Sequence, residues 1–344
     1  MISQYESCIL FVTGKNDTKK QKKHKKICKM TLNLEKEGGT DVNSKKRSKY
    51  AYLYLAPFFI VFLIFNLFPI LYSFVLSFCD MDVLSGDLTF IGWDNYERMI
   101  ESGYFFQSIG NTLLIWIMSI IPQLTIAFLL ALILSNKWFR GRFILRNIYY
   151  FPNLVTPVTI GLLFGAMFSY PGGAINNIIS ALGLEAVDFQ NNQMLARMVI
   201  AIAICWKNFG FNIIYFTAGI NSISEDVLEA AEVDGASSWQ RITKITIPLM
   251  RPILIYVLVT SVIGGLQMFD ESKLVFTNVP GDATTTMVKY MYDSAFVRFQ
   301  FGYSAAVSYG IFVIIAFFSV ISLIVTRDRD DAYGKTRRIW KGRK

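Results

Sequence analysis

The sequence predicts an all-α membrane protein with six transmembrane helices and both termini in the cytoplasm. Three observations lead to this fold class. Of the 344 residues, 53% are hydrophobic and only 17% are charged, whereas about 25% are charged in ordinary soluble domains. The charged residues are segregated from long apolar runs, and the basic residues gather on one side of those runs. A soluble core does not require uncharged runs of this length, so the pattern favours several bilayer crossings.

The apolar runs are long enough to cross a membrane as helices. Four contain no Asp, Glu, Lys or Arg: 51–79, 103–136, 147–184 and 299–326. A hydrocarbon core about 30 Å thick needs about 20 residues of helix, and barrel strands would instead show about ten residues of alternating polarity. Two further runs are apolar except for Lys207 in one of them, 198–220 and 252–269. The predicted helices are therefore 52–78, 111–134, 147–169, 196–220, 252–269 and 304–325.

The basic residues predict the orientation of these helices. Thirteen Lys or Arg lie in 1–50 and eight follow residue 326, whereas the loop 79–110 holds only Arg98. The positive-inside rule therefore places both termini in the cytoplasm, which requires an even number of crossings. The net charge of +9 is explained as an orientation signal, and we expect no nucleic-acid partner.

Three regions follow from this pattern: a basic tail over 1–50, a transmembrane domain over 51–326 and a basic cytoplasmic tail over 327–344. The stretch KKQKKHKKICK in the first tail is too highly charged to pack, so we expect disorder or attraction to anionic membrane lipids. Met30 is an alternative start, since the sequence after it leads directly into the first helix.

The sequence contains no motif typical of catalysis, cofactor binding or metal binding. The single histidine, His24, stands in the lysine run, and the cysteines 8, 28, 79 and 205 have no metal-type spacing. Gly334-Lys335-Thr336 lacks the earlier glycine of a phosphate-binding loop, because position 329 is Arg. We therefore expect no enzyme activity, no cofactor and no metal. No Asp or Glu lies well inside a predicted span, which disfavours an ion-coupled carrier.

The segment 222–252, between the fourth and fifth helices, predicts a helix–turn–helix. Ser222 followed by Glu225 has the spacing of a capping box. Gly235 stands where a helix would end in the left-handed conformation, which costs other residues about 1–2 kcal/mol. Ser238 is expected to cap a second short helix, and two prolines then interrupt the chain before the fifth span, at positions 248 and 252. A plain surface loop is the alternative, although a connection alone needs neither this length nor these caps.

The same segment resembles the signature loop of binding-protein-dependent ABC permeases. The shared pattern is Glu-Ala-Ala, two residues, Asp-Gly-Ala and then Pro-x-x-x-Pro. In that family the loop is the coupling helix, which docks into a groove on the ATPase subunit. The residues that this resemblance assigns to ATPase coupling are Glu229, Ala230, Ala231, Asp234, Gly235, Ala236 and Pro248.

Other stretches resemble the carbohydrate branch of this family, which includes maltose, lactose and glycerol-phosphate uptake systems. They include FIGWDNYERMI at 90–100, ILRNIYYFPNLVTP at 144–157 and WKNFGFNIIYFTAGI at 206–220. The similarity covers about 50–326. One departure is FTNVPGDATTT at 276–286, where relatives often carry two glycines before the proline.

The resemblance implies the permease fold of a type I ABC importer and a non-catalytic role in sugar uptake, with oligosaccharides as the substrate class. The implied partners are a second permease subunit, expected to be of different sequence, two ATP-binding subunits and an extracytoplasmic solute-binding protein. Which sugar is carried, and whether the two permeases are identical, stays open. The alternatives are a non-sugar solute, an ion-coupled carrier and, from another class, a membrane-embedded enzyme.

Polar residues within the spans are the candidates for a substrate pathway. Lys207 is the charge deepest in a predicted span, and a lysine at that depth costs about 2.5–3.5 kcal/mol on insertion scales. Sugar recognition by convergent polar groups is one interpretation, and hydrogen bonding between helices or snorkelling is the other. The candidate residues are Lys207, Asn208, Asn212, Gln267 and Asp270.

Overall fold

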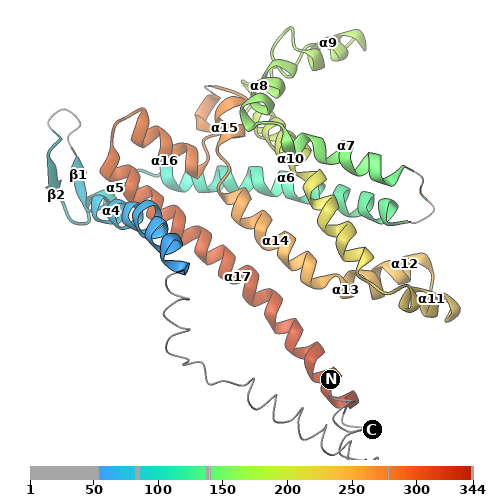
Figure 1. Cartoon of the computed structure of the whole chain (residues 1–344). Coiled ribbons are helices and arrows are strands. Elements are labelled where there is room, and N and C mark those ends of the chain that lie inside the picture. The colour runs from blue at the N-terminus through green and yellow to red at the C-terminus, as the bar shows by residue number, and fades with distance from the viewer. Residues whose placement is uncertain (1–53, 82–85, 137–138, 140, 278, 342–344) are drawn as a thin grey trace, which may run out of the picture. The chain divides into compact units, whose positions relative to one another are not determined.

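The computed structural model describes residues 54–81, 86–136, 139, 141–277 and 279–341, with side chains as far as Ile324. The described residues are mainly helical (Figure 1). The expected disordered tail over 1–50 and the alternative start at Met30 lie outside them.

Helices long and apolar enough to cross a membrane account for five of the expected spans. They are Tyr54–Leu76, Tyr104–Ser135, Gln193–Asn221, Arg251–Leu274 and Phe301–Ile324. A sixth is formed by α7 (Arg142–Leu154) and α8 (Pro157–Met167), two helices that meet at 91°. With this bent pair counted as one span, the number is the predicted six. Whether the two termini lie in the cytoplasm stays a prediction.

The bend in the third span corrects the expectation of one helix over 147–169. Val155, between the two helices, has an extended backbone with φ −73° and ψ 138°. The hydroxyl of Thr156 then accepts a hydrogen bond from the Thr159 amide at 3.3 Å and caps α8. Pro157 occupies the first turn of α8, where its missing N–H leaves no backbone bond unmade. Local capping chemistry therefore ends one helix and starts another inside a single apolar run.

The remaining spans differ from the prediction mainly at their ends. α6 (Tyr104–Ser135) begins earlier than the predicted residue 111, α10 covers Gln193–Asn221, and α17 runs through Phe301–Lys341. The first span contains the π-helix η1 (Leu63–Leu67) followed by α4 (Phe68–Leu76). The fifth is interrupted, because α14 (Arg251–Leu266) ends at Gln267 and the short helix α15 (Asp270–Leu274) follows.

Shorter elements connect the spans. Strands β1 (Cys79–Met81) and β2 (Leu88–Phe90) pair antiparallel, with Cys79 opposite Phe90. The other connecting elements are α5 (Asp94–Glu101), α9 (Ala174–Ala181), α11 (Glu225–Val233), α12 (Ser238–Arg241), the π-helix η2 (Ile242–Thr246), α13 (Ile247–Leu249), the 3₁₀-helix η3 (Pro280–Asp282) and α16 (Met287–Phe296).

The chain divides into two compact units, Met1–Leu71 and Tyr72–Lys344. Packing in the second unit centres on α10, which contacts α6, α7, α8, α14 and α15. Small residues occupy its contact with α6: Ala127 and Ala131 on α6 and Ala203 on α10 are fully buried. Small side chains let membrane helices approach closely, which is how they gain packing energy where lipid is as apolar as the protein.

Two glycines mark the closest approaches between helices. A Cβ on Gly210 of α10 would collide with the backbone carbonyl of Tyr149 in α7. A Cβ on Gly265 of α14 would collide with the indole ring of Trp116 in α6, whose Nε1–H donates to the Ser261 carbonyl at 3.1 Å. α10 and α14 are thereby held against their neighbours near the polar residues that both carry.

Candidate functional site

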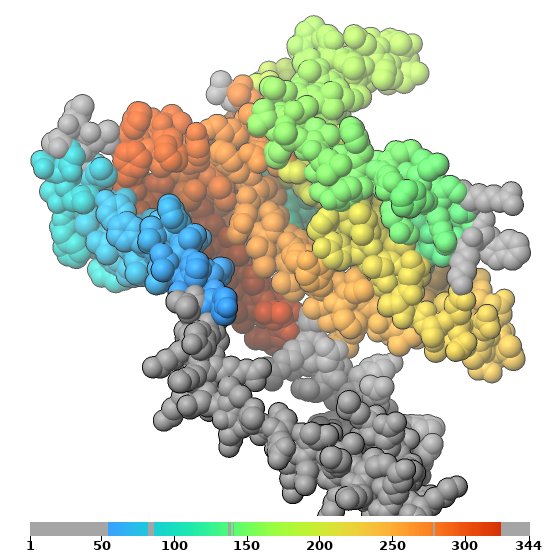
Figure 2. Space-filling model, viewed as in Figure 1, coloured from blue at the N-terminus to red at the C-terminus, as the bar shows by residue number. Residues whose placement is uncertain are grey.

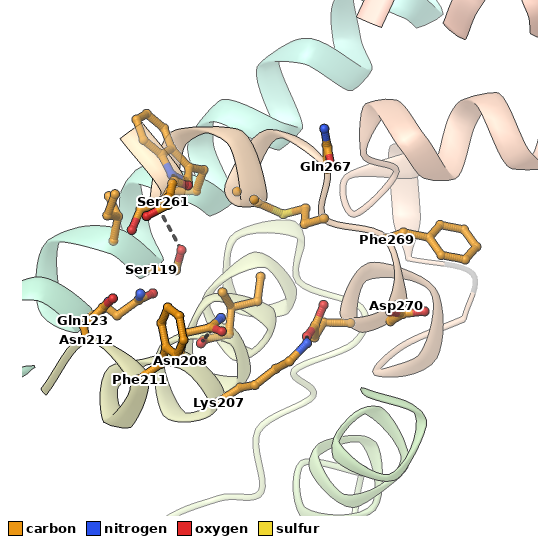
Figure 3. A pocket seen from close by; sticks show the side chains of 18 residues that line it. Ser119, Gln123, Lys207, Asn208, Phe211, Asn212, Ser261, Gln267, Phe269 and Asp270 are labelled. Carbon is orange, nitrogen blue, oxygen red and sulfur yellow. Dashed lines mark hydrogen bonds and ion pairs between the residues drawn. The ribbon is translucent and has the colours of Figure 1, made fainter. Parts of the chain in front are cut away.

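A cavity of about 330 Å³ lies between α6, α10, α14 and α15 (Figure 3). All of the residues proposed from the sequence for a substrate pathway line it: Lys207, Asn208, Asn212, Gln267 and Asp270. The first three follow one another along α10, Gln267 is the residue that ends α14, and Asp270 begins α15. The structure therefore brings together residues separated by about 60 positions in the chain.

The spacing along α10 places its polar residues on the cavity. Positions 208 and 212 are four apart, so they lie one above the other on one face of a helix. α6 adds polar side chains from the facing wall, Ser119 and Gln123. In Figure 3 the side chains of Gln123, Asn208 and Asn212 gather at one end of the cavity, and Lys207 extends toward the end where Asp270 lies.

Among the described residues that line the cavity, Asn212 has a buried side-chain donor without a hydrogen-bond partner. Only 4% of its surface is exposed, and its Nδ2 has no hydrogen-bond partner in the structure. An unpaired buried donor costs about 1–3 kcal/mol. Asn208 differs, since its Nδ2 donates to the Ile204 carbonyl at 3.0 Å. The Asn212 amide is therefore the group in this cavity that a bound acceptor would satisfy.

Lys207 is neutralised by a residue that the sequence reasoning missed. Its Nζ lies 2.8 Å from Oε1 of Glu271, whose side chain is only 6% exposed. The prediction that no carboxylate lies well inside a span depended on ending the fifth span at residue 269. The candidate span in the structure continues to Leu274 and includes Glu271. A lysine within an apolar helix needs a counter-charge, and that requirement could have directed attention to the acidic residues just past residue 269.

The cavity wall also offers apolar surface. Trp116, Phe211 and Phe269 line it together with Gly264 and Gly265. Aromatic faces next to amides and hydroxyls form a lining suited to a ligand with both apolar and hydroxyl surfaces. In the described part of the chain, no group of three or more His, Cys, Asp or Glu side chains is placed to hold a metal ion.

The loop around η3 is anchored at the same end of the spans as α15. Asn111 of α6 donates from Nδ2 to the carbonyls of Asp282 at 2.9 Å and Thr285 at 3.1 Å. Arg197 of α10 donates to the Ala283 carbonyl at 2.9 Å and to Asn111 Oδ1 at 2.8 Å. The buried Asn111 and the half-buried Arg197 therefore fix residues 282–285 from two spans, and Gly281 and Asp282 both have positive φ.

The segment expected to couple to an ATPase forms a helix–turn–helix at the other end of α10. α11 ends at the left-handed Gly235, with φ +81°. The amide of Gly235 donates to the Glu232 carbonyl at 3.0 Å, and the amide of Ala236 donates to the Ala231 carbonyl at 2.9 Å. This pair of bonds is a Schellman motif, so the predicted role of Gly235 in ending the helix is confirmed.

The helix caps of this segment differ from the prediction. Ser222 ends α10, and its hydroxyl donates to the Gly219 carbonyl at 2.7 Å, so the expected capping box with Glu225 is wrong. Ser224 is the N-cap of α11 and makes no side-chain cap bond. A capping box does form at the start of α12, between Ser237 and Gln240. The N-cap of α12 is therefore Ser237 and not Ser238. Two serines one or two positions apart could not be ranked from sequence alone.

An ion pair and a hairpin-like turn join the two short helices. Arg241 of α12 lies 2.6 Å from Glu232 of α11. Most of the proposed coupling residues are exposed here, namely Glu229, Ala230, Asp234 and Gly235, whereas Ala231 is buried and Ala236 and Pro248 are half-buried. Two large apolar side chains also face solvent, Val233 at 88% and Trp239 at 73% exposure. The space-filling view shows the yellow atoms of α11 and α12 uncovered on the face in view (Figure 2).

The model of one protein family, described as "Binding-protein-dependent transport system inner membrane component", matches residues 113–328. The chain belongs to this family. It is a multi-pass inner membrane protein and the permease component of a binding-protein-dependent ABC importer.

Curated relatives of the permease are similar over most of its length. AraP of Bacillus subtilis (strain 168), an arabinooligosaccharides transport system permease, is 32% identical and aligns with 81% of this chain and 88% of its own. LacF of Rhizobium radiobacter, a lactose transport system permease, is 33% identical and aligns with 81% of this chain and 94% of its own. MalF of Thermococcus litoralis, from a trehalose/maltose transport system, is 30% identical, with 83% and 96% aligned.

A solved structure shares the fold of the permease. It belongs to a bacterial ABC transporter that imports the acidic polysaccharide alginate, and the match has a TM-score of 0.74 and 27% identity over 82% of this chain and 96% of the other. A second structure of an alginate transporter, in complex with a pentasaccharide-bound periplasmic protein, also matches with a TM-score of 0.74. The region matched by the family model, 113–328, contains the whole cavity lining, from Trp116 to Glu271. It also contains the segment 222–252.

Proposed function

We propose that this permease imports oligosaccharides through the cavity between α6, α10, α14 and α15, and that residues 222–252 couple this movement to an ATPase. It would form half of the translocation pathway, beside a second and different permease subunit. Two ATP-binding subunits would hydrolyse ATP, and an extracytoplasmic binding protein would deliver the sugar. The permease itself would catalyse no reaction.

One observation carries the proposal for the pathway. The buried Nδ2 of Asn212 lacks a partner and belongs to a cavity lined by amides, hydroxyls and aromatic rings. A sugar presents hydroxyl groups, which accept and donate, together with apolar ring faces that pack on aromatic side chains. Asn208, Gln267 and Asp270 would then contact or orient the substrate from the same walls of the cavity. Lys207 would line the pathway with its ammonium held by Glu271.

The sugar class is supported by the relatives. AraP, LacF and MalF are named for arabinooligosaccharides, lactose and trehalose or maltose. The permease aligns with more than four-fifths of each of these proteins, so the transfer of substrate class concerns equivalent whole chains.

The coupling role is supported by the surface of α11 and α12. A partner protein gains most from exposed apolar anchors with a polar surround, and Val233 and Trp239 stand beside the exposed Glu229 and Asp234. The Schellman motif, the capping box and the Glu232–Arg241 pair make the segment one body. Such a body transmits a push from ATPase closure to α10 and α14, the spans to which it is joined.

This role also sets the orientation. Both termini and the coupling segment would lie in the cytoplasm, and the α15 end of the cavity and the η3 loop would face the binding protein. The transmembrane domain would span 51–326, with basic cytoplasmic tails over 1–50 and 327–344.

The Lys207–Glu271 pair is the kind of intramembrane ionisable group that ion-coupled carriers also use. A protonophore therefore provides the control for the energy source. Uptake driven by ATP survives a protonophore, whereas ion-coupled uptake stops.

The test is reconstitution of the complex purified on this chain, in liposomes that contain ATP and with its binding protein outside. We would add arabinotriose, lactose, maltotriose and an amino acid mixture, and measure both ATP hydrolysis and uptake. The expected result is stimulation of ATP hydrolysis by one or more of the sugars and not by the amino acids, insensitive to a protonophore.

The outcomes separate the parts of the proposal. Stimulation by amino acids alone would contradict the sugar class and leave the coupling intact. Absence of a co-purifying ATPase would contradict the role of residues 222–252.

A further inference from the structure

We infer that Glu271 sets the charge selectivity of the cavity: by pairing with Lys207 it removes the ammonium from the substrate's reach, so that the permease accepts neutral saccharides and disfavours anionic ones. The inference rests on the proposed function, since it takes this cavity as the sugar pathway. Glu271 acts through Lys207 and is therefore a positioning residue.

The cavity lining carries three charged residues, namely Lys207, Asp270 and Glu271. Their formal charges of +1, −1 and −1 sum to −1. The ammonium is the lining group that would attract a carboxylate, and its Nζ already lies 2.8 Å from Glu271 Oε1. With Lys207 neutralised, Asp270 gives the remaining lining a negative character. An anionic ligand would lose its own hydration without a charge to replace it.

The pairing is held by how α15 packs. A Cβ on Gly161 of α8 would collide with the side chain of Leu274, and one on Gly165 would lie 2.6 Å from the carbonyl oxygen of Val275. α15 therefore sits directly on the backbone of α8. Glu271 stands on this fixed element with its side chain 6% exposed, whereas that of Lys207 is 20% exposed. The packing of α15 on α8 thus places the carboxylate of Glu271 beside the ammonium, with little solvent around it.

The fold alone does not dictate this selectivity. A transporter with a TM-score of 0.74 to this chain imports the acidic polysaccharide alginate. The same arrangement of helices therefore serves a polyanion in one protein, and the choice between neutral and anionic cargo must come from side chains. Glu271 is such a side chain, because replacing it with glutamine would raise the formal charge of the lining from −1 to 0 and release an ammonium.

The experiment uses two probes that differ at one carbon: arabinotriitol, in which C1 of the opened terminal residue is an alcohol, and arabinotrionate, in which that carbon is a carboxylate. Both have an opened terminal ring, so their shapes match. Binding to the purified complex in nanodiscs, without the binding protein, is measured by saturation-transfer difference NMR titration. The quantity of interest is the ratio of the two dissociation constants.

We expect the wild-type complex to bind the neutral probe more tightly, and Glu271→Gln to shift the ratio toward the anion by about tenfold. The matched control is Lys207→Gln with Glu271→Gln, which keeps the formal charge at −1 and removes the ammonium. It should return the ratio to the wild-type value. Neutral binding retained by both variants shows that the cavity is intact.

Three results would overturn the inference. One is that Glu271→Gln leaves the ratio of the two dissociation constants at its wild-type value. Another is that the double variant shifts this ratio as much as Glu271→Gln alone. The third applies if Glu271→Gln does not assemble: Asp270→Asn raises the lining charge equally without touching the pair, and an unchanged ratio there would contradict the charge argument. If lactose or maltotriose stimulates ATP hydrolysis in the test above and arabinotriose does not, the probes are the alditol and the aldonate of that sugar. If none of those sugars does so, the proposed sugar pathway fails first and the inference falls with it.

Discussion

The coupling segment and the cavity are built in opposite ways. In the segment, the hydrogen bonds and the ion pair that close the turn between α11 and α12 join residues at most nine positions apart, such as Ser237 with Gln240 and Glu232 with Arg241. In the cavity, the lining runs from Trp116 to Glu271, and its central ion pair joins residues 64 positions apart. Local sequence therefore specifies the first region almost alone, whereas the second exists only when α6, α10, α14 and α15 have packed. Variants that affect one region and not the other test this difference.

The largest effect is expected for Gly235→Asp, which should abolish uptake while membrane insertion continues. Its φ of +81° is disfavoured by about 1–2 kcal/mol for most residues with a side chain, and the new carboxylate would stand on the exposed turn between α11 and α12. Gly183 has the same φ of +81° and, like Gly235, open space around it. Gly183→Asp therefore controls for backbone strain and should keep uptake. Membrane fractions and sugar uptake measure both, and equal loss in the two variants would argue against a special role for the coupling turn.

Gly210→Val should lower the stability of the protein by forcing α7 and α10 apart. Overpacking of this kind costs about 1–3 kcal/mol, and we expect the upper end because the obstacle is the backbone carbonyl of Tyr149. Thermal unfolding of the purified complex would measure the loss. Gly110→Val in α6 is the control, because nothing lies within 4 Å of its added Cβ. A similar loss in both variants would mean that helix propensity and not close packing decides the result.

Asn212→Leu should raise the KM for the transported sugar without lowering the stability of the protein. The substitution removes a buried amide donor that has no partner, so stability should hold or rise, and the KM for the transported sugar should increase by about tenfold, or 1.4 kcal/mol. Asn176 is the contrasting site, since its amide bonds the Ser169 carbonyl and both backbone groups of Val187. Asn176→Leu should lower the unfolding temperature and leave KM unchanged. An unchanged KM in Asn212→Leu would remove this residue from the substrate pathway.

The smallest effect is expected for Arg241→Gln. The partner carboxylate of Glu232 is 68% exposed, and ion pairs between exposed residues contribute about 0–1 kcal/mol. Uptake should fall by less than about twofold, and high salt should reduce the difference from wild type. A loss as large as that of Gly235→Asp would show that the ion pair, and not the caps, holds the segment together.

The sequence was most informative where structure depends on neighbours along the chain. Six apolar runs predicted the spans, and Gly235 predicted the end of α11, because helix length and left-handed backbone are local properties. The cap of α12 was misplaced by one residue and the cap near Ser222 was wrong, since adjacent serines compete for the same role. The bend at Val155 was missed although Thr156-Pro157 has the composition of a helix start.

The cavity was predicted only in part. Five lining residues could be chosen from the sequence as polar residues near apolar runs, and all five line the same cavity in the structure: Lys207, Asn208, Asn212, Gln267 and Asp270. Glu271 could not be paired with Lys207 from spacing, because that contact depends on where α15 packs against α8 and α10. A close approach between two helices, such as that of Gly161 to Leu274, produces no periodic pattern in the sequence and cannot be predicted from it.

The self-contained bonding of the coupling segment has an evolutionary consequence. Substitutions at sites that share no contacts add nearly independently in their effect on stability, and the turn between α11 and α12 makes its bonds within itself. Substitutions in the lining of the cavity therefore need no compensating change in the turn to preserve stability. Under the coupling role proposed above, a graft of this turn between related permeases would change the ATPase partner and leave the transported sugar unchanged.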